Sequence, residues 1–294
     1  MTSTKVSTQT CGCKGVRFCA LCETSERVQK LKIADDKYAD YDVYVFSRIS
    51  GSCIRCPALT STATVGDIIE ASKSCDSAKC YQNAIFIGGI MVVPDFLSES
   101  EEHDLLVMID GVDWMLSQSG RRKQDYGPKV NFKRRKVKTD HFSGMPEYAD
   151  WLLERMQLIS EEKLGNYIPF EMCNLEYDQS KKSCIEMHCD DVWIWGNRLI
   201  SINLLSGSVM TLTNDESRQL CYIWMPRRSL LCISDEARYR WQHGILSHHI
   251  QGRRIALTMR EPSKEFQEGG DLYEKYGKQL IALSNNRVPL RKCV

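Results

Sequence analysis

No apolar run in the sequence approaches the ~20 residues of a membrane-spanning helix, so contact with a membrane is not expected. The N-terminal residues are rich in Ser and Thr and lack the apolar core of a signal peptide, which predicts an intracellular protein of the cytoplasm and nucleus. The chain also has almost no net charge, with 39 Lys and Arg against 38 Asp and Glu. Attraction to nucleic acid or to an acidic protein must therefore come from a local cluster of charge.

Cysteine, by contrast, is abundant, with 14 in 294 residues. Because thiols stay reduced inside cells, these residues are better interpreted as metal ligands or buried thiols than as a disulfide framework. Four of them share one short segment with the spacing C-x-C…C-x-x-C, which suits a tetrahedral zinc site. A cysteine-containing tail without metal is the alternative. The zinc ligands expected from this spacing are Cys11, Cys13, Cys19 and Cys22.

Changes in composition divide the chain into four parts. The second part is rich in Ser and Thr and shows little periodicity, so a poorly defined linker is predicted there, with a flexible connection over residues 72–78. The four parts are a Cys-rich segment (1–30), the linker region (31–83), a main domain (84–262) and a C-terminal helix and tail (263–294).

The main domain is predicted to be mainly β with flanking helices. Ser98 followed three residues later by Glu101 is typical of a helix start and predicts a helix to about residue 109. Helical spacing of apolar residues predicts further helices over 148–159 and 272–283. Short strands between Gly, Pro, Asn and Asp predict a sandwich or barrel. Strands are expected at 41–46, 85–93, 171–177, 199–205, 209–213, 220–224, 229–233 and 254–260.

One short segment carries a histidine and an aspartate two residues apart, His188 and Asp190. On a strand or just past its end, such residues can point to one side of the backbone. His243 supplies a second imidazole further along the chain. Two imidazoles and one carboxylate form the facial triad of non-haem Fe(II) oxygenases, which leaves coordination positions open. His248 and His249 are competitors by composition, but they lack the sequence context of His243.

Two arginines downstream, Arg254 and Arg260, are six residues apart and therefore face the same way on one strand. Their planar guanidinium groups suit a dicarboxylate cosubstrate, because each can donate two parallel hydrogen bonds to a carboxylate. A surface strand with two basic residues is the alternative interpretation.

These residues occur among further motifs in an order that resembles a known family, the AlkB-type Fe(II)/2-oxoglutarate dioxygenases. The resemblance extends from about residue 94 to 261 and also reaches the N-terminal cysteines. It implies a double-stranded β-helix, a jelly-roll of the cupin-like kind, with Fe(II), 2-oxoglutarate and O2 as cofactor and cosubstrates. The motifs are Pro94-Asp95-Phe96-Leu97, the stretch 117–132, Cys173-Asn174-Leu175, Trp193-x-Trp195-Gly196 and Arg-Tyr-x-Trp-x-His-Gly-Ile around His243.

The resemblance also implies roles for individual residues. It implies that iron is bound by His188, Asp190 and His243. It further implies that 2-oxoglutarate is held at its two ends by Arg254 and Arg260 and oriented by Asn174 and Tyr177, with Asn-Leu-Glu-Tyr here in place of the family's Asn-x-Tyr.

Residues 117–138 carry nine Lys or Arg against one acidic residue, with aromatic residues between them. Such a region suits phosphate contacts and base stacking, but it would equally attract an acidic protein surface. A nuclear import signal and a plain solvated basic face are further interpretations. In the family that the sequence resembles, this region forms a lid over the substrate pocket. The expected lid residues are Arg121, Arg122, Lys123, Tyr126, Lys129 and Phe132.

The activity implied by the resemblance is oxidative N-demethylation, in which 2-oxoglutarate becomes succinate and CO2 and the methyl carbon leaves as formaldehyde. The most similar subfamily is associated with monomethyl-lysine in actin and with N6-methyladenine in DNA. Demethylation of a protein lysine, in actin by resemblance, is the favoured hypothesis, and demethylation of DNA is the alternative. A non-enzymatic interaction protein that recruits partners through the Cys-rich segment and the basic lid is the third hypothesis.

Overall fold

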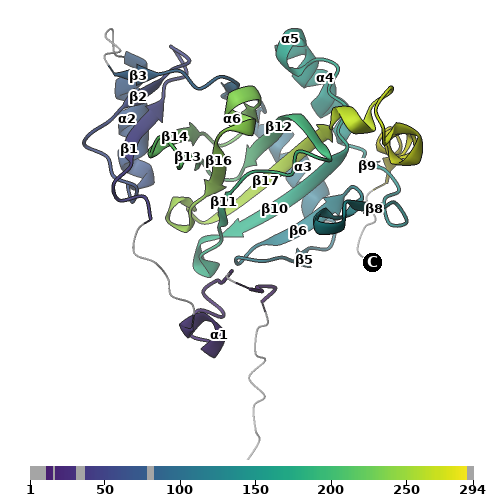
Figure 1. Cartoon of the computed structure of the whole chain (residues 1–294), viewed down its shortest axis with the longest axis horizontal. Helices are drawn as coiled ribbons and strands as arrows, with labels where there is room; N and C mark the ends of the chain where they lie inside the picture. The colour runs from purple at the N-terminus through teal and green to yellow at the C-terminus, as the bar shows by residue number, and fades with distance from the viewer. Residues whose placement is uncertain (1–10, 16, 31–36, 78–82, 290–294) are drawn as a thin grey trace, which may run out of the picture.

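Two facing β-sheets form the body of the molecule in a computed structural model that describes residues 11–15, 17–30, 37–77 and 83–289 (Figure 1). Sheet A contains, in spatial order, β11 (Ile185–His188), β16 (Gln242–Ile245), β13 (Ser208–Asn214), β14 (Gln219–Met225), β1 (Asp42–Phe46), β2 (Cys53–Arg55) and β3 (Ala84–Ile85). Sheet B contains β4 (Ile90–Val93), β15 (Leu230–Ile233), β12 (Trp195–Leu204), β17 (Arg253–Pro262), β10 (Glu171–Asp178), β6 (Arg122–Tyr126) and β5 (Met115–Leu116).

The strand order shows a double-stranded β-helix. Strands distant in the sequence pair side by side, as β10 does with β17 and β11 with β16. From β10 to β17 the chain alternates between the two sheets, except that β13 and β14 form a hairpin within sheet A. Within these sheets the described pairs are antiparallel, except that β1 runs parallel to β14. The predicted mainly-β jelly-roll with flanking helices is therefore confirmed.

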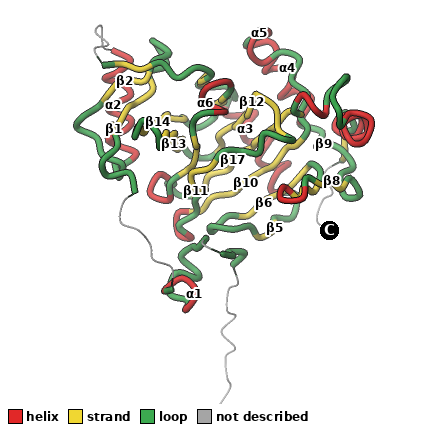
Figure 2. The backbone as a smooth tube through the Cα atoms, viewed as in Figure 1, coloured by secondary structure: helices red, strands yellow, loops and turns green. Residues whose placement is uncertain are grey.

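Helices cover the outer faces of both sheets (Figure 2). On sheet B, apolar residues of α3 (Glu99–Asp110), α4 (Ala149–Ile159) and α7 (Lys278–Ser284) pack against outward-facing residues of β12 and β17. On sheet A, α2 (Val65–Ser77) packs against β1 and β14. A third apolar cluster lies between the sheets. None of the described helices combines the length and the hydrophobicity needed to cross a bilayer.

The helix predicted to start at Ser98 is confirmed as α3. The Ser98 hydroxyl accepts a hydrogen bond from the Glu101 backbone N–H, and the Glu101 carboxylate accepts one from the Ser98 N–H at 2.8 Å. Each side chain thus satisfies a backbone donor that the first helical turn leaves free. Arg155 on α4 donates to the same carboxylate, which joins the two helices that cover sheet B.

The strand predicted over residues 85–93 is divided between the two sheets, as β3 and β4. Gly88 and Gly89 form the break between them, and Gly89 has a φ of +89°. A Cβ at Gly89 would lie 2.0 Å from the Ser234 carbonyl oxygen, so only glycine fits this approach.

The described part of the predicted linker belongs to the folded body. It forms β1, β2 and α2, and the segment 72–78 that was expected to be flexible lies mainly in α2, with residue 78 outside the described residues. The helix is difficult to recognise because two of the residues it buries, Ser72 and Cys75, are small, so its apolar periodicity is weak. His249 connects this part to the barrel, since its Nε2 lies 3.1 Å from the Ala63 carbonyl oxygen.

The remaining elements are short. A hairpin, β7 (Lys129–Asn131) and β8 (Lys136–Lys138), follows β6 and encloses a 3-10 turn (Phe132–Arg134). The helix predicted over 272–283 forms a π-helical turn (Tyr273–Gly277) that continues into α7. The others are α1 (Glu26–Gln29), β9 (Met145–Pro146), α5 (Glu161–Leu164), a 3-10 turn (Gln179–Lys181), α6 (Asp235–Tyr239), further 3-10 turns (Ser247–His249 and Lys264–Phe266) and β18 (Arg287–Val288).

Candidate metal and dicarboxylate site

Strand pairing brings two histidines together at one end of the cavity between the sheets. His188 ends β11 and is the direct cross-strand partner of His243 on β16, with ring centroids 4.4 Å apart. Asp190 lies two residues beyond β11, with its Oδ1 3.6 Å from His188 Nε2. One ligand-capable atom from each residue lies within 4.8 Å of the other two, so these three residues could hold one metal ion.

The protonation states of these residues favour metal binding. His188 Nδ1 lies 2.7 Å from the Glu186 carbonyl oxygen, to which only a protonated Nδ1 can donate, so in the neutral ring Nε2 is the nitrogen that offers a lone pair to a metal. Burial lowers the pKa of His243 to about 3, which keeps that imidazole neutral. Burial opposes ionisation of Asp190, but Arg260 and His188 outweigh it and hold its pKa well below the usual range. Neutral imidazoles and an ionised carboxylate are the forms that coordinate metals.

Arg260 is occupied by protein carboxylates. Its Nε and Nη2 donate to the two Asp190 oxygens at 2.8 and 3.2 Å, and its Nη1 donates to Glu171 at 2.5 Å. Glu171 is the register partner of Arg260 on the neighbouring strand β10. Its guanidinium group thus fixes the orientation of Asp190. Arg260 also lines the cavity, so its contact with one end of a dicarboxylate stays a prediction.

Arg254, by contrast, has a guanidinium nitrogen without a hydrogen-bond partner among the described residues. It is only 1% exposed, and its guanidinium carbon lies 4.9 Å from the centre of the Tyr177 ring. Its Nε donates to Asn203 Oδ1 at 2.5 Å, but its buried Nη1 has no hydrogen-bond partner among the described residues. A buried cationic donor without an acceptor is costly, so this atom fits a ligand carboxylate.

The metal-ligand candidates and Arg254 line the same cavity. Thr258 and Ser201 add hydroxyl groups to its wall, while most of the lining is apolar. Apolar walls exclude water and so strengthen electrostatic contacts inside the cavity. The apolar lining residues include Leu175, Met210, Leu231, Ile233, Ile245 and Ala256.

Asn174 does not line the cavity, although the family resemblance assigned it to the cosubstrate. It lies three residues before Tyr177 on β10, so the two side chains leave opposite faces of sheet B. Its side-chain amide is fully buried and donates to Gln124 and to Tyr148, at 2.8 Å each. The asparagine that contacts Arg254 is Asn203 on β12, which no sequence motif indicates and which only the pairing of β12 with β17 brings near.

Four of the six predicted lid residues lie on or directly before a strand of sheet B. Arg122, Lys123 and Tyr126 lie on β6, which pairs with β10, and Arg121 directly precedes it. Arg122 is ion-paired with Glu176. Lys123 is likewise ion-paired, with Asp125, and the role of these four residues in a lid stays a prediction.

Only the two last lid residues, Lys129 and Phe132, lie on an exposed hairpin. Lys129 begins β7, and Phe132 in the following 3-10 turn is 49% exposed. This hairpin is the part of the predicted basic lid that remains accessible to a partner.

The four N-terminal cysteines come together as their spacing predicts. Their sulfurs all lie within 4.8 Å of one another, and the sulfurs of Cys19 and Cys22 are 3.9 Å apart. The structure therefore contains two candidate metal sites in its described part, one of histidine and carboxylate and one of thiols.

Comparison with known proteins identifies the family. No family model matches the chain. The chain is 62% identical over 284 residues to a DNA N6-methyl adenine demethylase from Caenorhabditis elegans, covering 97% of each protein. It is 34% identical over 304 residues to the alpha-ketoglutarate-dependent dioxygenase alkB homolog 4 of Homo sapiens, covering 93% of each. It also resembles the solved structure of OsALKBH1, with a TM-score of 0.45 and 12% identity over 59% of this chain and 96% of that one. The chain therefore belongs to the AlkB family of 2-oxoglutarate-dependent dioxygenases.

Proposed function

We propose that this dioxygenase removes the methyl group of N6-methyladenine in DNA. The observation that carries the proposal is the 62% identity, over 97% of both chains, to a DNA N6-methyl adenine demethylase. This reverses the order of the two substrates favoured from the sequence. The relative in Homo sapiens is named for its cosubstrate, so it supports neither actin nor DNA as the substrate.

In this proposal the two ends of the cavity have separate tasks. His188, Asp190 and His243 hold Fe(II), which, when bound, couples the decarboxylation of 2-oxoglutarate by O2 to oxidation of the methyl carbon. Arg260 keeps Asp190 ionised and oriented. Arg254 donates from its unpartnered Nη1 to a 2-oxoglutarate carboxylate. The two positive centres thus serve different carboxylates.

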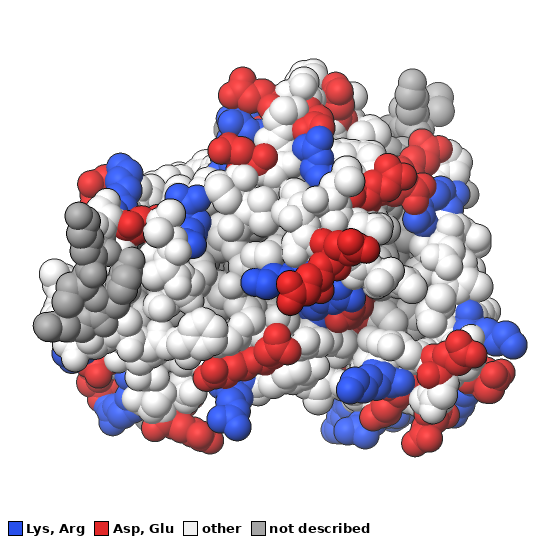
Figure 3. Space-filling view, turned by 90° about the horizontal axis from the view of Figure 1, so that it is seen from above, with Lys and Arg blue, Asp and Glu red and all other residues white. Residues whose placement is uncertain are grey.

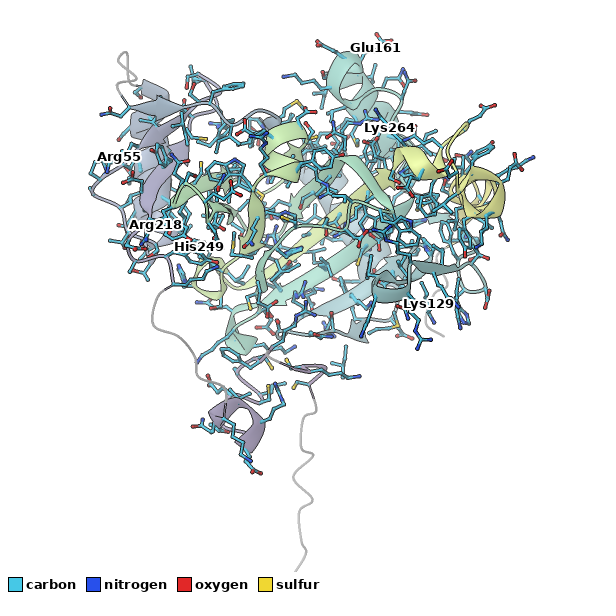
Figure 4. All side chains as sticks on the ribbon, in the orientation of Figure 1. Arg55, Lys129, Glu161, Arg218, His249 and Lys264 are labelled. Atoms are coloured by element: carbon cyan, nitrogen blue, oxygen red, sulfur yellow. The ribbon has the colours of Figure 1, made fainter. Side chains whose placement is uncertain are left out.

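An exposed basic hairpin supports DNA as the substrate. The strand register shows where this hairpin begins. Tyr126, the last residue of β6, pairs with Met172, and the neighbouring Glu171 accepts a hydrogen bond from Arg260. The hairpin β7–β8 therefore leaves the sheet from the metal-bearing end, and Figure 4 shows Lys129 at the periphery, far from Arg55. None of its basic residues has an ion pair in the described part of the chain: Lys129, Lys133, Arg134, Arg135, Lys136 and Lys138.

Phe132 lies among these cations and is 49% exposed. Proteins that bind single-stranded nucleic acid combine cations, which contact phosphates, with aromatic side chains, on which bases stack. On the face that Figure 3 shows, acidic and basic side chains are intermixed. The hairpin is thus a local positive surface on a chain of net charge +1.

Monomethyl-lysine in a protein, such as actin, is the second candidate. The same unpaired cations would attract an acidic protein surface, so the hairpin alone does not separate the two substrates. Binding to DNA should weaken steeply as salt rises, because each phosphate contact releases counterions.

A paired assay tests the proposal. The full chain with Fe(II) and 2-oxoglutarate is offered N6-methyladenine DNA and a monomethyl-lysine actin, each with its unmethylated counterpart as control. We expect formaldehyde from the methylated DNA only. Activity on actin alone would overturn the proposed substrate while leaving the dioxygenase in place, and succinate without formaldehyde from either would exclude both.

Two asparagine variants test the proposed cosubstrate site. Asn203→Ala removes the acceptor of Arg254 and is expected to raise the KM for 2-oxoglutarate about tenfold, the cost of one hydrogen bond to a charged group. Asn174→Ala is expected to lower the free energy of unfolding by about 1–3 kcal/mol, because it leaves Gln124 and Tyr148 unsatisfied, and to leave this KM unchanged. The measurements are succinate formation against 2-oxoglutarate concentration and denaturant unfolding. A KM raised by Asn174→Ala alone would contradict the assignment.

A further inference from the structure

The four-cysteine segment is docked onto the barrel beside the cosubstrate end of the cavity. Figure 1 shows α1 and the chain before it beneath β11 and β5. The Ala20 N–H donates to the Lys181 carbonyl oxygen at 3.1 Å, and Lys182 pairs with Glu23 at 2.7 Å. A Cβ on Gly12 would lie 2.3 Å from the Ser117 carbonyl oxygen, so the two backbones are in direct contact.

The sulfur geometry fits one tetrahedral zinc ion. Zn–S bonds of about 2.3 Å place the sulfurs of a tetrahedron roughly 3.8 Å apart, and Cys19 and Cys22 are separated by 3.9 Å. The four thiols are free, and that distance is well beyond the length of a disulfide bond, about 2.05 Å.

Donors face the sulfurs as well. Cys22 Sγ accepts from the Cys19 N–H and from Arg27 Nη2, both at 3.4 Å, and Cys13 Sγ accepts from the Ser119 N–H at 3.2 Å. Four thiolates around one divalent ion carry a net charge of −2, which these N–H groups and the Arg27 cation would offset.

The loop that receives Cys13 is conformationally costly. Ser119 and Gly120 both have positive φ, +54° and +74°. A non-glycine residue in this region needs surrounding contacts to hold it there. Ser119 Oγ donates to Glu186, and Ser183 Oγ donates to the Gly120 carbonyl oxygen at 2.7 Å. The Cys184 N–H donates to the Ser119 carbonyl oxygen at 3.1 Å, and the Cys13 sulfur accepts from the Ser119 N–H.

The next residue of this loop reaches the cosubstrate end. Arg121 is 8% exposed, and its guanidinium carbon lies 5.8 Å from the centre of the Tyr177 ring. Arg254 lies 4.9 Å from the same ring, so Tyr177 is in contact with both cations. Contacts therefore run without interruption from Cys13 through the loop and Arg121 to Tyr177 and Arg254.

We infer that Cys11, Cys13, Cys19 and Cys22 bind a structural zinc ion, and that the zinc-bound segment positions Arg121 and Tyr177 so that Arg254 is held ready for 2-oxoglutarate. Zinc is then a requirement for cosubstrate affinity without touching the cosubstrate. The effect on affinity rests on the proposed role of Arg254, whereas zinc binding itself does not.

Metal analysis of the full chain by mass spectrometry tests the zinc site. One zinc per chain is expected in the wild type and in Cys56→Ser, a control cysteine outside the cluster. Cys19→Ser should lose it. Zinc retained by Cys19→Ser, or never present in the wild type grown with zinc, would overturn the site.

Hydrogen exchange and calorimetry test the positioning role. In Cys19→Ser, amides of residues 117–121 should exchange at least about tenfold faster, because the loop loses the Cys13 sulfur that accepts from the Ser119 N–H. The Kd for 2-oxoglutarate, measured with Mn(II) in place of iron, should rise several-fold, and Arg121→Met should raise it while keeping zinc.

Unchanged exchange in a zinc-free variant would overturn the positioning role whatever the enzyme's substrate. If Cys19→Ser does not fold, the same exchange is measured on wild-type protein stripped with a zinc chelator. Absence of 2-oxoglutarate binding in the wild type would instead count against the proposed function, with zinc content and exchange still deciding the inference.

Discussion

Arg254→Met is expected to raise the KM for 2-oxoglutarate about 100-fold, since truncating one partner of a buried charge pair costs roughly 2–5 kcal/mol. The wild-type guanidinium is 1% exposed and keeps Nη1 without a partner among the described residues, so a carboxylate is the acceptor that this atom lacks. Methionine retains an unbranched apolar side chain that can lie against Tyr177. Initial rates of succinate formation over a range of 2-oxoglutarate concentrations measure the effect.

Arg253→Met is the matched control for this prediction. Arg253 neighbours Arg254 on β17 but leaves the other face, where it pairs with Asp110 and Glu176. The control should lose stability without a change in KM. If both variants fold and bind 2-oxoglutarate as the wild type does, the assignment of Arg254 to the cosubstrate is refuted.

The sequence predicts the metal site better than it predicts the cosubstrate site. His188 and Asp190 share a short segment, and His243 carries its own motif, so their meeting needs only the pairing of β11 with β16. The partners of Arg260 depend on register, because Glu171 reaches it only when β10 and β17 pair as they do. No spacing in the sequence encodes that register.

The placement of Asn174 outside the cavity has a visible signal in the sequence. The family's Asn-x-Tyr spacing puts both side chains on one face of a strand, whereas in Asn-Leu-Glu-Tyr the two residues are three positions apart, an odd spacing. Since strand side chains alternate, the additional residue turns Asn174 to the helix-covered face of sheet B, and Leu175 takes the place facing the cavity. Asn203 has no such signal, because it comes from a different strand.

His243→Ala is expected to remove bound iron and to lower turnover by 10³-fold or more, because losing a direct ligand should exceed the roughly 10- to 100-fold cost of losing an outer partner. The site has three candidate protein ligands, and His243 is the most buried of them. In His243→Ala only a water molecule could take the place of the lost imidazole ligand. Iron per chain by mass spectrometry and formaldehyde release under saturating 2-oxoglutarate measure the two effects.

His103→Ala provides the control, because His103 is an exposed histidine on α3, which packs on the outer face of sheet B, whereas β16 belongs to sheet A. It should keep both iron and turnover.

Asp190→Asn adds a sharper test, because it leaves Arg260 facing a neutral amide as well as removing the ligand charge. If these three residues bind iron, Asp190→Asn should lose the metal even though the side-chain volume is unchanged. If His243→Ala retains iron and still releases formaldehyde, the metal and the reaction must lie elsewhere in the protein.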